Sequence, residues 1–265
     1  MPEIFQYAFM QRAFLVGILL SVIISLIGVV VVLKRLSMIG DALSHTSLAG
    51  VALGMILGLQ PVVGAVVVCI LAAFSIEGIR KAVPRYAEIS VSIIMSVGIG
   101  LASILSGYVE DGAAFNAFLF GSIVAITDTE VILALVVTVI VLTAFLLLYK
   151  ELMYIIFDEQ GAILAGMPVK KINFVVTLLT AITVSVAARS VGALIVSSLM
   201  VIPVTCAMQV ADSYKKTVLY SVLFSLLFTV VGLTLSFYLN LKPGGTIVLT
   251  GVAVLIPLMA VKRER

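Results

Sequence analysis

The residues best suited to chemistry are an aspartate and a histidine that stand close together in an otherwise apolar stretch. Asp41 and His45 are four residues apart in IGDALSHTSLAGVALG, and His45 is the single histidine of the chain. On an α-helix this spacing places both side chains on one face, with their Cβ atoms about 6 Å apart. A carboxylate and an imidazole that converge in this way form half of a site for zinc, manganese or iron.

Two interpretations of this pair are open. It is either a buried hydrogen bond near the membrane surface or part of a transport path, because ionisable residues inside a membrane usually mark such a path. Two ligands are too few for a closed tetrahedral site. A permeating ion, however, has to leave as readily as it enters, so weak coordination suits transport. Two copies of the chain that met at this face would supply four ligands. We favour the transport path.

The element that positions the pair is expected to lie in a membrane. The chain has 265 residues, of which 63% are hydrophobic and 11% charged, and its mean hydropathy is +1.32. A soluble domain has roughly half apolar and about a quarter charged residues. The composition therefore predicts an all-α polytopic membrane protein, with one domain covering residues 1–265. Cys69 and Cys206 lie in apolar runs and are expected to serve packing.

Other function classes are disfavoured. A net charge of +3 without a long basic block argues against nucleic acid as a partner. The sequence has no GxxxxGK[ST] motif, so we expect no ATP hydrolysis by this chain through a P-loop, and HExxH and GxSxG are missing as well. We expect a transport subunit that is not itself an enzyme.

Nine apolar runs are long enough to cross a hydrocarbon core of about 30 Å, which takes about 20 helical residues. They cover residues 13–33, 36–59, 61–79, 89–109, 131–149, 172–188, 190–211, 217–241 and 243–261. In this assignment Asp41 lies about five residues into the second run. A tenth stretch, 112–127, has 16 residues and is expected to form a re-entrant or surface helix on the outer side.

The positive-inside rule orients the nine spans. With the N-terminus outside and the C-terminus in the cytoplasm, 13 of the 16 lysines and arginines are cytoplasmic, and those outside are Arg12, Arg189 and Lys242. If 112–127 crossed the membrane, this bias would be lost. The orientation is therefore predicted to be N-out and C-in.

Glycines recur at a spacing of four on the helix that carries Asp41. Gly50, Gly54 and Gly58 are expected to let another helix approach closely. We favour packing within the chain over lining of a path, and in both cases this helix is expected to be interior.

The longest cytoplasmic segment is predicted to be the loop 150–171, KELMYIIFDEQGAILAGMPVKK. A short helical stretch is expected to begin at Asp158 and Glu159 and to end at Gly166 and Pro168. From the residues alone, this stretch is either an amphipathic connector or a docking element for a cytoplasmic partner.

The sequence resembles a known family, the membrane permease subunits of bacterial zinc/manganese/iron ABC importers. The resemblance extends over nearly the whole chain and includes GDALSH with the small-residue helix after it, FDEQGAILAGMPVKKIN, VGALIVSSLMVIPVTCAM and LSFYLNLKPGGTIVLTGVAVL. It implies a type II ABC importer permease fold, as in the cobalamin and iron-chelate permeases, with two copies around one pathway in the bacterial inner (plasma) membrane. It also implies a cytoplasmic ATPase dimer, which uses the ATP, and an extracellular metal-binding solute-binding protein.

The resemblance also assigns roles to residues. Asp41 and His45 would touch the metal in the translocation path. The cytoplasmic segment from Phe157 to Val169 would be the coupling segment that sits in a cleft of the ATPase, and its motif positions are Phe157, Asp158, Glu159, Gly161 and Gly166. Because His45 has no second histidine to help it, coordination is expected to be transient, with no permanently bound cofactor. The opening segment is closer to zinc-type members, so Zn²⁺ is the expected substrate and Mn²⁺ the alternative.

A rival from another class is a proton-coupled secondary metal carrier, in which Asp41 and His45 would relay protons. Such carriers often contain paired repeats with broken helices, and no such pairing is visible in this sequence. A structural anchor for another complex is a third possibility, and it would leave the intramembrane pair unexplained.

Overall fold

The computed structural model describes residues 3–82, 87–122 and 126–263, and these residues form helices joined by short connections. Arg85 and Arg265, which the topology prediction counts as cytoplasmic, lie outside the described residues. Within the described ranges the chain has a 3-10 turn, Glu3–Gln6, followed by α1 (Ala8–Leu33), α2 (Met38–Ile56), α3 (Pro61–Ala82), α4 (Ala87–Ser106), α5 (Gly112–Phe120), α6 (Asp128–Leu147), α7 (Tyr149–Phe157), α8 (Glu159–Leu164), α9 (Val169–Ala187), a π-helical turn (Ala188–Gly192), α10 (Ala193–Val210), α11 (Tyr214–Leu239) and α12 (Pro243–Arg263).

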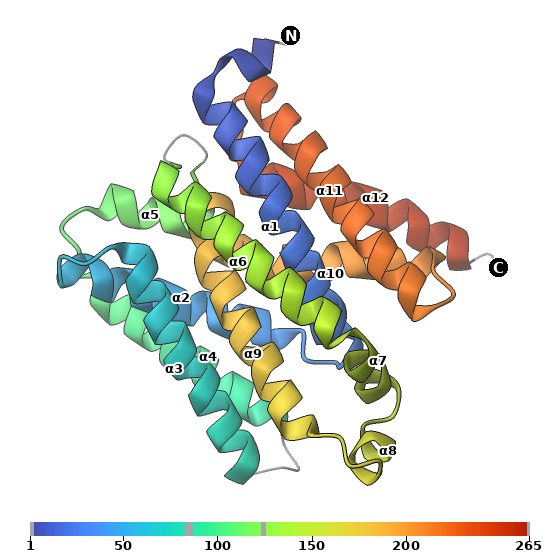
Figure 1. Ribbon diagram of the computed structural model, residues 1–265. Coiled ribbons are helices and arrows are strands. Elements are labelled where there is room, and N and C mark those ends of the chain that lie inside the picture. The colour runs from blue at the N-terminus through green and yellow to red at the C-terminus, as the bar shows by residue number, and fades with distance from the viewer. Residues whose placement is uncertain (1–2, 83–86, 123–125, 264–265) are drawn as a thin grey trace.

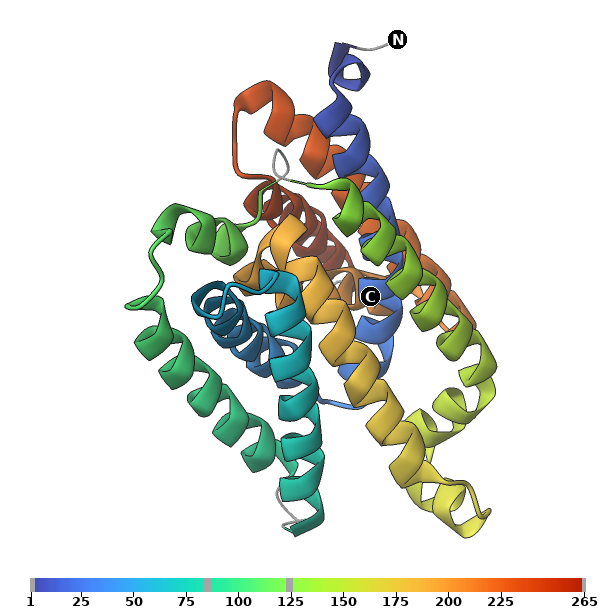
Figure 2. The same ribbon diagram turned by 60° about the vertical axis from the view of Figure 1, so that its left-hand side comes forward.

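The expected all-α membrane fold is confirmed. In the described ranges eight helices are long and apolar enough to cross a bilayer, and α10 is a shorter apolar helix. Together they correspond to the nine predicted runs. In Figure 1, α1, α3, α6, α9 and α11 run side by side, while α2 and α10 cross them at a steep angle. The N-terminus and α8 lie at opposite ends of the molecule in Figures 1 and 2.

Burial separates interior helices from peripheral ones. In α2, 72% of the apolar stretch is buried inside the chain, whereas in α12 only 17% is buried. The prediction that α2 is interior is therefore confirmed. Apolar side chains such as Ile104, Leu135 and Leu249 are exposed on α4, α6 and α12, which fits helices that meet lipid. Cys69 and Cys206 are free thiols buried in the core, as their apolar surroundings predict.

The tenth stretch, 112–127, contains a helix that is too short to cross. Helix α5 has nine residues, or about 13 Å at a rise of 1.5 Å per residue. Asp111 caps it by accepting a hydrogen bond from Ala114 N at 2.9 Å, and Gly121 with φ +78° ends it. Residues 123–125 lie outside the described residues. The side of the membrane on which α5 lies stays a prediction.

A close backbone contact holds α5 against the junction of α9 and α10. The junction is a π-helical turn that ends at Gly192, whose φ is +104°. A Cβ atom at Gly192 would lie 2.5 Å from the carbonyl carbon of Phe120, and one at Gly121 would lie 2.5 Å from that of Val191. Both positions therefore require glycine, because a side chain would meet backbone atoms that cannot move aside.

Candidate functional site

Asp41 lies closer to the helix end than the sequence assignment placed it. Helix α2 begins at Met38, so Asp41 is in the first turn and not about five residues into a span that starts at residue 36. The preceding residues form a tight turn in which Leu36 N donates to Val31 O at 2.8 Å and Arg35 adopts φ +58°. This is the geometry of a Schellman end, in which the chain leaves a helix through a left-handed residue.

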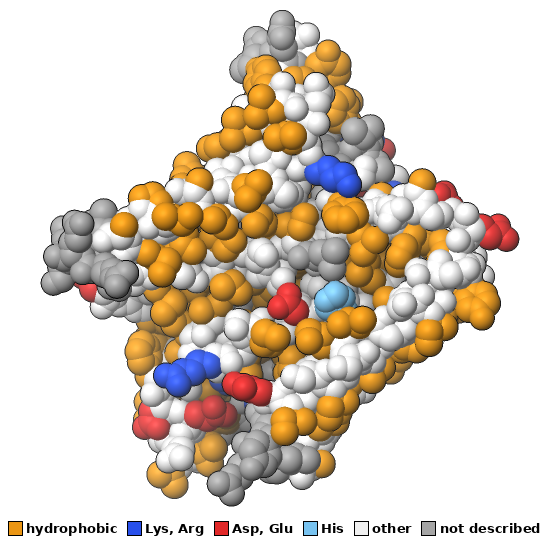
Figure 3. All heavy atoms as spheres, turned by 180° about the vertical axis from the view of Figure 1, so that it is seen from behind, with side chains coloured by type: hydrophobic (Ala, Val, Ile, Leu, Met, Phe, Trp, Pro, Cys, Tyr) orange, Lys and Arg blue, Asp and Glu red, His pale blue; other side chains and the backbone are white. Residues whose placement is uncertain are grey.

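Asp41 and His45 share one face of α2, as their spacing predicts. Both side chains are half-buried, whereas Ala42, Leu43 and Ser44 between them are buried. Figure 3 shows the histidine open to this face of the molecule with an acidic side chain beside it. The pair is therefore accessible from outside the chain, although most of α2 is enclosed.

An open pocket lies beside Asp41, between the start of α2 and α10. Its volume is about 360 Å³, and its lining residues are Ser37, Met38, Asp41, Ser197, Ser198, Val201 and Ile202. A carboxylate and three hydroxyl groups thus border the same space. Among the described residues no group of three or more His, Cys, Asp or Glu side chains could hold a metal ion. Asp41 and His45 of one copy are therefore two of the donors that a metal ion would need.

The three glycines that were predicted to pack against a helix have two different structural roles. A Cβ atom on Gly50 would lie 2.6 Å from Gly64 O, and one on Gly54 would lie 3.2 Å from Pro61 Cα, so both positions face α3 at close range. This is packing within the chain. Gly58 has no such contact: nothing lies within 4 Å of its Cβ position, and its φ is +66°. The expectation that Gly58 packs against a helix is wrong, because it follows the end of α2 and supplies the left-handed turn.

The loop 150–171, which is predicted to be cytoplasmic, contains the expected short helix. Helix α8 begins at Glu159, and Asp158 caps it by accepting from Gly161 N at 2.8 Å. A Cβ atom on Gly161 would lie 2.2 Å from Asp158 Oδ2, so a side chain there would displace the capping carboxylate. Gly166, with φ +78°, ends the helix, and Met167 N donates back to Ala162 O at 3.0 Å. The preceding residues, read as loop, form the separate helix α7.

Three apolar side chains stand out from this loop. Phe157 is 73% exposed, Ile163 57% and Leu164 88%. Sequence reasoning included Phe157 and missed Ile163 and Leu164, although two adjacent apolar residues in a stretch with Asp, Glu and Gln were a visible signal. We call these three side chains the α8 apolar surface.

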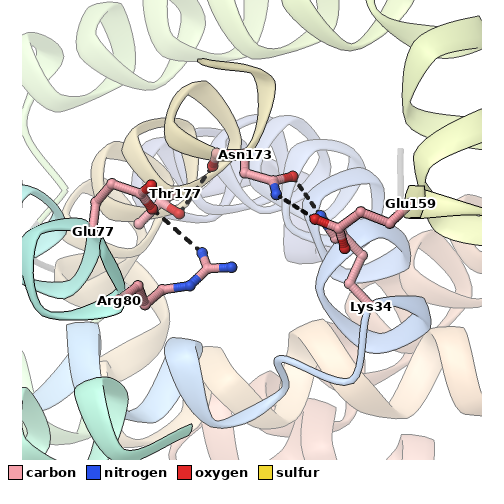
Figure 4. Close-up of polar contacts among 6 residues, drawn as sticks. All are labelled: Lys34, Glu77, Arg80, Glu159, Asn173 and Thr177. Carbon is pink, nitrogen blue, oxygen red and sulfur yellow. Dashed lines mark hydrogen bonds and ion pairs between the residues drawn. The ribbon is translucent and has the colours of Figure 1, made fainter. Parts of the chain in front are cut away.

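A chain of hydrogen bonds connects α8 to the end of α1, and sequence reasoning did not find it. The Lys34 Nζ group donates to Asn173 Oδ1, and Asn173 Nδ2 donates to Glu159 Oε1 at 3.1 Å. Figure 4 shows the ends of the Lys34 and Glu159 side chains beside each other, each bonded to the side-chain amide of Asn173. Beside them, Arg80 pairs with Glu77 at 3.4 Å. Burial lowers the pKa of Lys34, and the nearby Glu159 carboxylate opposes this effect.

Ion pairs also gather near the start of α6. Arg12 contacts Asp128 at 2.8 Å and donates to Ile126 O at 3.4 Å. Arg189 of the π-helical turn pairs with Glu130 and lies 5.0 Å above the ring of Phe118. Two of the three basic residues predicted to be outside are therefore neutralised by acidic residues predicted to be on the same side.

The sequence matches a known protein family over nearly its whole length. The model of the ABC 3 transport family matches residues 6–262. The chain belongs to this family.

Relatives of this permease include members whose names specify different metals. It is 33% identical over 260 residues to the "High-affinity zinc uptake system membrane protein ZnuB" of Haemophilus influenzae, an alignment that covers 96% of this chain and 97% of the relative. It is 28% identical over 250 residues to the "Manganese transport system membrane protein MntC" of Listeria monocytogenes, with 94% and 89% covered.

A solved structure has the same fold as this permease. One chain of "PsaBC from Streptococcus pneumoniae in complex with Fab" aligns with a TM-score of 0.86 at 29% identity, over 96% of this chain and 92% of that one. The expected permease fold is thereby confirmed over nearly the full length.

Proposed function

We propose that this permease conducts a divalent transition metal ion across the bacterial inner membrane, driven by ATP that a separate subunit hydrolyses. The observation that carries the proposal is the Asp41–His45 face: a carboxylate and an imidazole lie together, half-buried and accessible, on a helix most of whose residues are buried inside the chain. Membership of a transport family with zinc and manganese relatives supports it. The metal is the transported substrate.

Zinc is the substrate we propose, with manganese as the alternative. An imidazole ligand suits Zn²⁺, and the ZnuB relative shares more residues with this chain than the MntC relative does. The manganese alternative has one observation in its favour. The pocket beside Asp41 is lined by the hydroxyl groups of Ser37, Ser197 and Ser198, and oxygen donors suit Mn²⁺.

Three partners follow from this function. A second copy of the chain would complete the path, because the Asp41–His45 face of one copy supplies two ligands and lies open. A cytoplasmic ATPase dimer would dock at the coupling segment, where the α8 apolar surface is exposed. An extracellular solute-binding protein would deliver the metal at the opposite end. The N-out and C-in orientation stays a prediction.

The test is radiotracer Zn²⁺ uptake into vesicles that contain the permease, its ATPase and its binding protein, with and without ATP and with Mn²⁺ as competitor. ATP-dependent zinc accumulation that resists excess Mn²⁺ is the expected result. Efficient competition by Mn²⁺ would keep the class and change the metal. Zinc uptake driven by a pH gradient without ATP would replace the proposal with the carrier.

Substitution of the histidine tests the site itself. His45→Ala removes one of the two ligands, so uptake should fall sharply while the complex still assembles. The matched control is Ser75→Ala on α3, whose exposed hydroxyl donates to Leu71 O of its own helix; it should transport normally. Uptake at the normal rate in His45→Ala would refute the metal-path assignment.

A further inference from the structure

We propose that Asn173 is a positioning residue that couples α8 to the start of α2, through Glu159 on one side and Lys34 on the other. The inference rests on the proposed function, since it explains how movement of the coupling segment reaches the Asp41–His45 face. We call the three side chains the Asn173 bridge.

The bridge has a defined direction. The carbonyl oxygen of Asn173 accepts from the Lys34 ammonium, and its amide nitrogen donates to the Glu159 carboxylate at 3.1 Å. Each end of the amide therefore meets the charge that it can satisfy. Hydrogen bonds to charged groups are stronger than those between neutral groups, and Asn173 is only 8% exposed, so water has little access to compete for its amide.

The connection from Lys34 to Asp41 is short and stiff. Four residues, 34–37, separate α1 from α2, and backbone hydrogen bonds cross the turn from Lys34 N to Val30 O, from Arg35 N to Val32 O, from Leu36 N to Val31 O and from Ile39 N to Leu36 O, all between 2.8 and 3.0 Å. Because the turn is internally bonded, a displacement of Lys34 moves the first turn of α2 instead of stretching a loose loop. Asp41 lies in that first turn.

The other end of the bridge is the part of the chain that a partner can reach. Glu159 is the first residue of α8, and it is exposed, as is the α8 apolar surface. A subunit that gripped this surface would move Glu159, and the Asn173 bridge would carry the movement to the turn before α2. The pair Glu77–Arg80 lies beside the bridge at the end of α3 (Figure 4) and contacts none of its three side chains by a hydrogen bond among the residues drawn.

Changes at Asn173 should uncouple transport from ATP hydrolysis. Asn173→Leu removes both hydrogen bonds, and Asn173→Asp keeps the acceptor for Lys34 but places a carboxylate against Glu159. In vesicles with the ATPase and binding protein, both variants should hydrolyse ATP while the metal transported per ATP falls by about tenfold or more. Asn173→Leu loses two charge-assisted bonds, whereas Asn173→Asp loses one and gains a repulsion from Glu159. Glu159→Gln keeps an acceptor for Asn173 Nδ2 but removes its charge, so its loss of coupling should be smaller than that of Asn173→Leu. Lys170→Glu changes an exposed charge at the start of α9, the helix that contains Asn173, and serves as the charge control.

A charge exchange between Lys34 and Glu159 is the most discriminating test of the bridge. Lys34→Glu and Glu159→Lys should each uncouple alone. Combined, they should recover most of the transport per ATP, because the Asn173 amide can turn over and present its oxygen to the new ammonium and its nitrogen to the new carboxylate. ATPase co-purification is measured in all variants. If Glu159 acts only by touching the ATPase, the double exchange will be no better than the worse single variant, and the bridge is overturned.

A final experiment tests the bridge without measuring transport. Hydrogen exchange of the permease alone should show that Asn173→Leu speeds amide exchange both in 159–164 and in 34–37, two segments far apart in sequence, while Lys170→Glu changes neither. Unchanged exchange in 34–37 would overturn the inference even if metal transport is confirmed. If the unsubstituted complex accumulates no metal with ATP, the proposed function fails, and the exchange result still decides whether the bridge exists.

Discussion

Two glycines in backbone contact hold α2 against α3. A Cβ atom on Gly50 would lie 2.6 Å from Gly64 O, and a Cβ atom on Gly64 would lie 2.3 Å from Gly50 O. Neither oxygen belongs to a flexible side chain, so a methyl group at either position has to push the helices apart. Close approach of this kind is a main source of helix association in membranes.

Gly50→Ala should therefore destabilise the permease by about 1–3 kcal/mol, the usual cost of overpacking. The measurement is the thermal unfolding midpoint in detergent. Gly100→Ala on α4 is the matched control, because nothing lies within 4 Å of its Cβ position and alanine favours a helix over glycine. An equal loss of stability in both variants would show that the α2–α3 contact is not what matters.

Residue types and spacing predicted part of the site, and long-range contacts supplied the rest. The i, i+4 spacing of Asp41 and His45 sufficed to place them on one face. The partners of Asn173 could not be read from the sequence, because Lys34 is 139 residues away and each of the three residues alone looks like an ordinary helix end. Gly58 was misjudged because a spacing of four does not reveal where a helix ends.

At the scale of elements, α8 is a short helix whose two acidic residues, Asp158 and Glu159, already accept hydrogen bonds from within the chain. Asp158 is occupied as its cap and Glu159 as an acceptor for Asn173, so what α8 offers a partner is mainly its apolar surface. Leu164, at 88% exposure, is the most prominent side chain of that surface.

Leu164→Asp should weaken association with the ATPase by about tenfold or more, since full burial of a leucine contributes about 1.5–3 kcal/mol. Co-purification of the two subunits at graded concentrations measures the effect. Leu164→Met retains apolar bulk and should bind normally. Unchanged binding of the aspartate variant would remove Leu164 from the interface.

Hydropathy predicted where the helices lie but not where the chain leaves them. The runs 89–109 and 217–241 correspond to α4 (Ala87–Ser106) and α11 (Tyr214–Leu239) with shifts of two or three residues. The start of α2 was missed because Leu36 is apolar yet belongs to the turn. The π-helical turn between α9 and α10 has no apolar signature, and its Gly192 lies in close backbone contact with Gly121.

For the whole molecule, the predicted orientation can be tested with thiol labelling. Tyr108→Cys lies between α4 and α5, in an exposed position predicted to be outside, and Lys215→Cys lies at the start of α11, in an exposed position predicted to be inside. A membrane-impermeant maleimide should label the first in intact spheroplasts and the second only after lysis. The unsubstituted chain should stay unlabelled because Cys69 and Cys206 are buried. The reverse pattern would invert the topology.

The α8 apolar surface has a consequence for a cell that makes the subunits in unequal amounts. The α8 apolar surface lies in a loop outside the spanning helices. An unassembled permease would therefore expose the apolar side chains of Phe157, Ile163 and Leu164 to water. Chaperones and proteases recognise such segments. The partner that covers them would then also protect the permease from degradation, and subunit stoichiometry would be set by turnover as well as by synthesis.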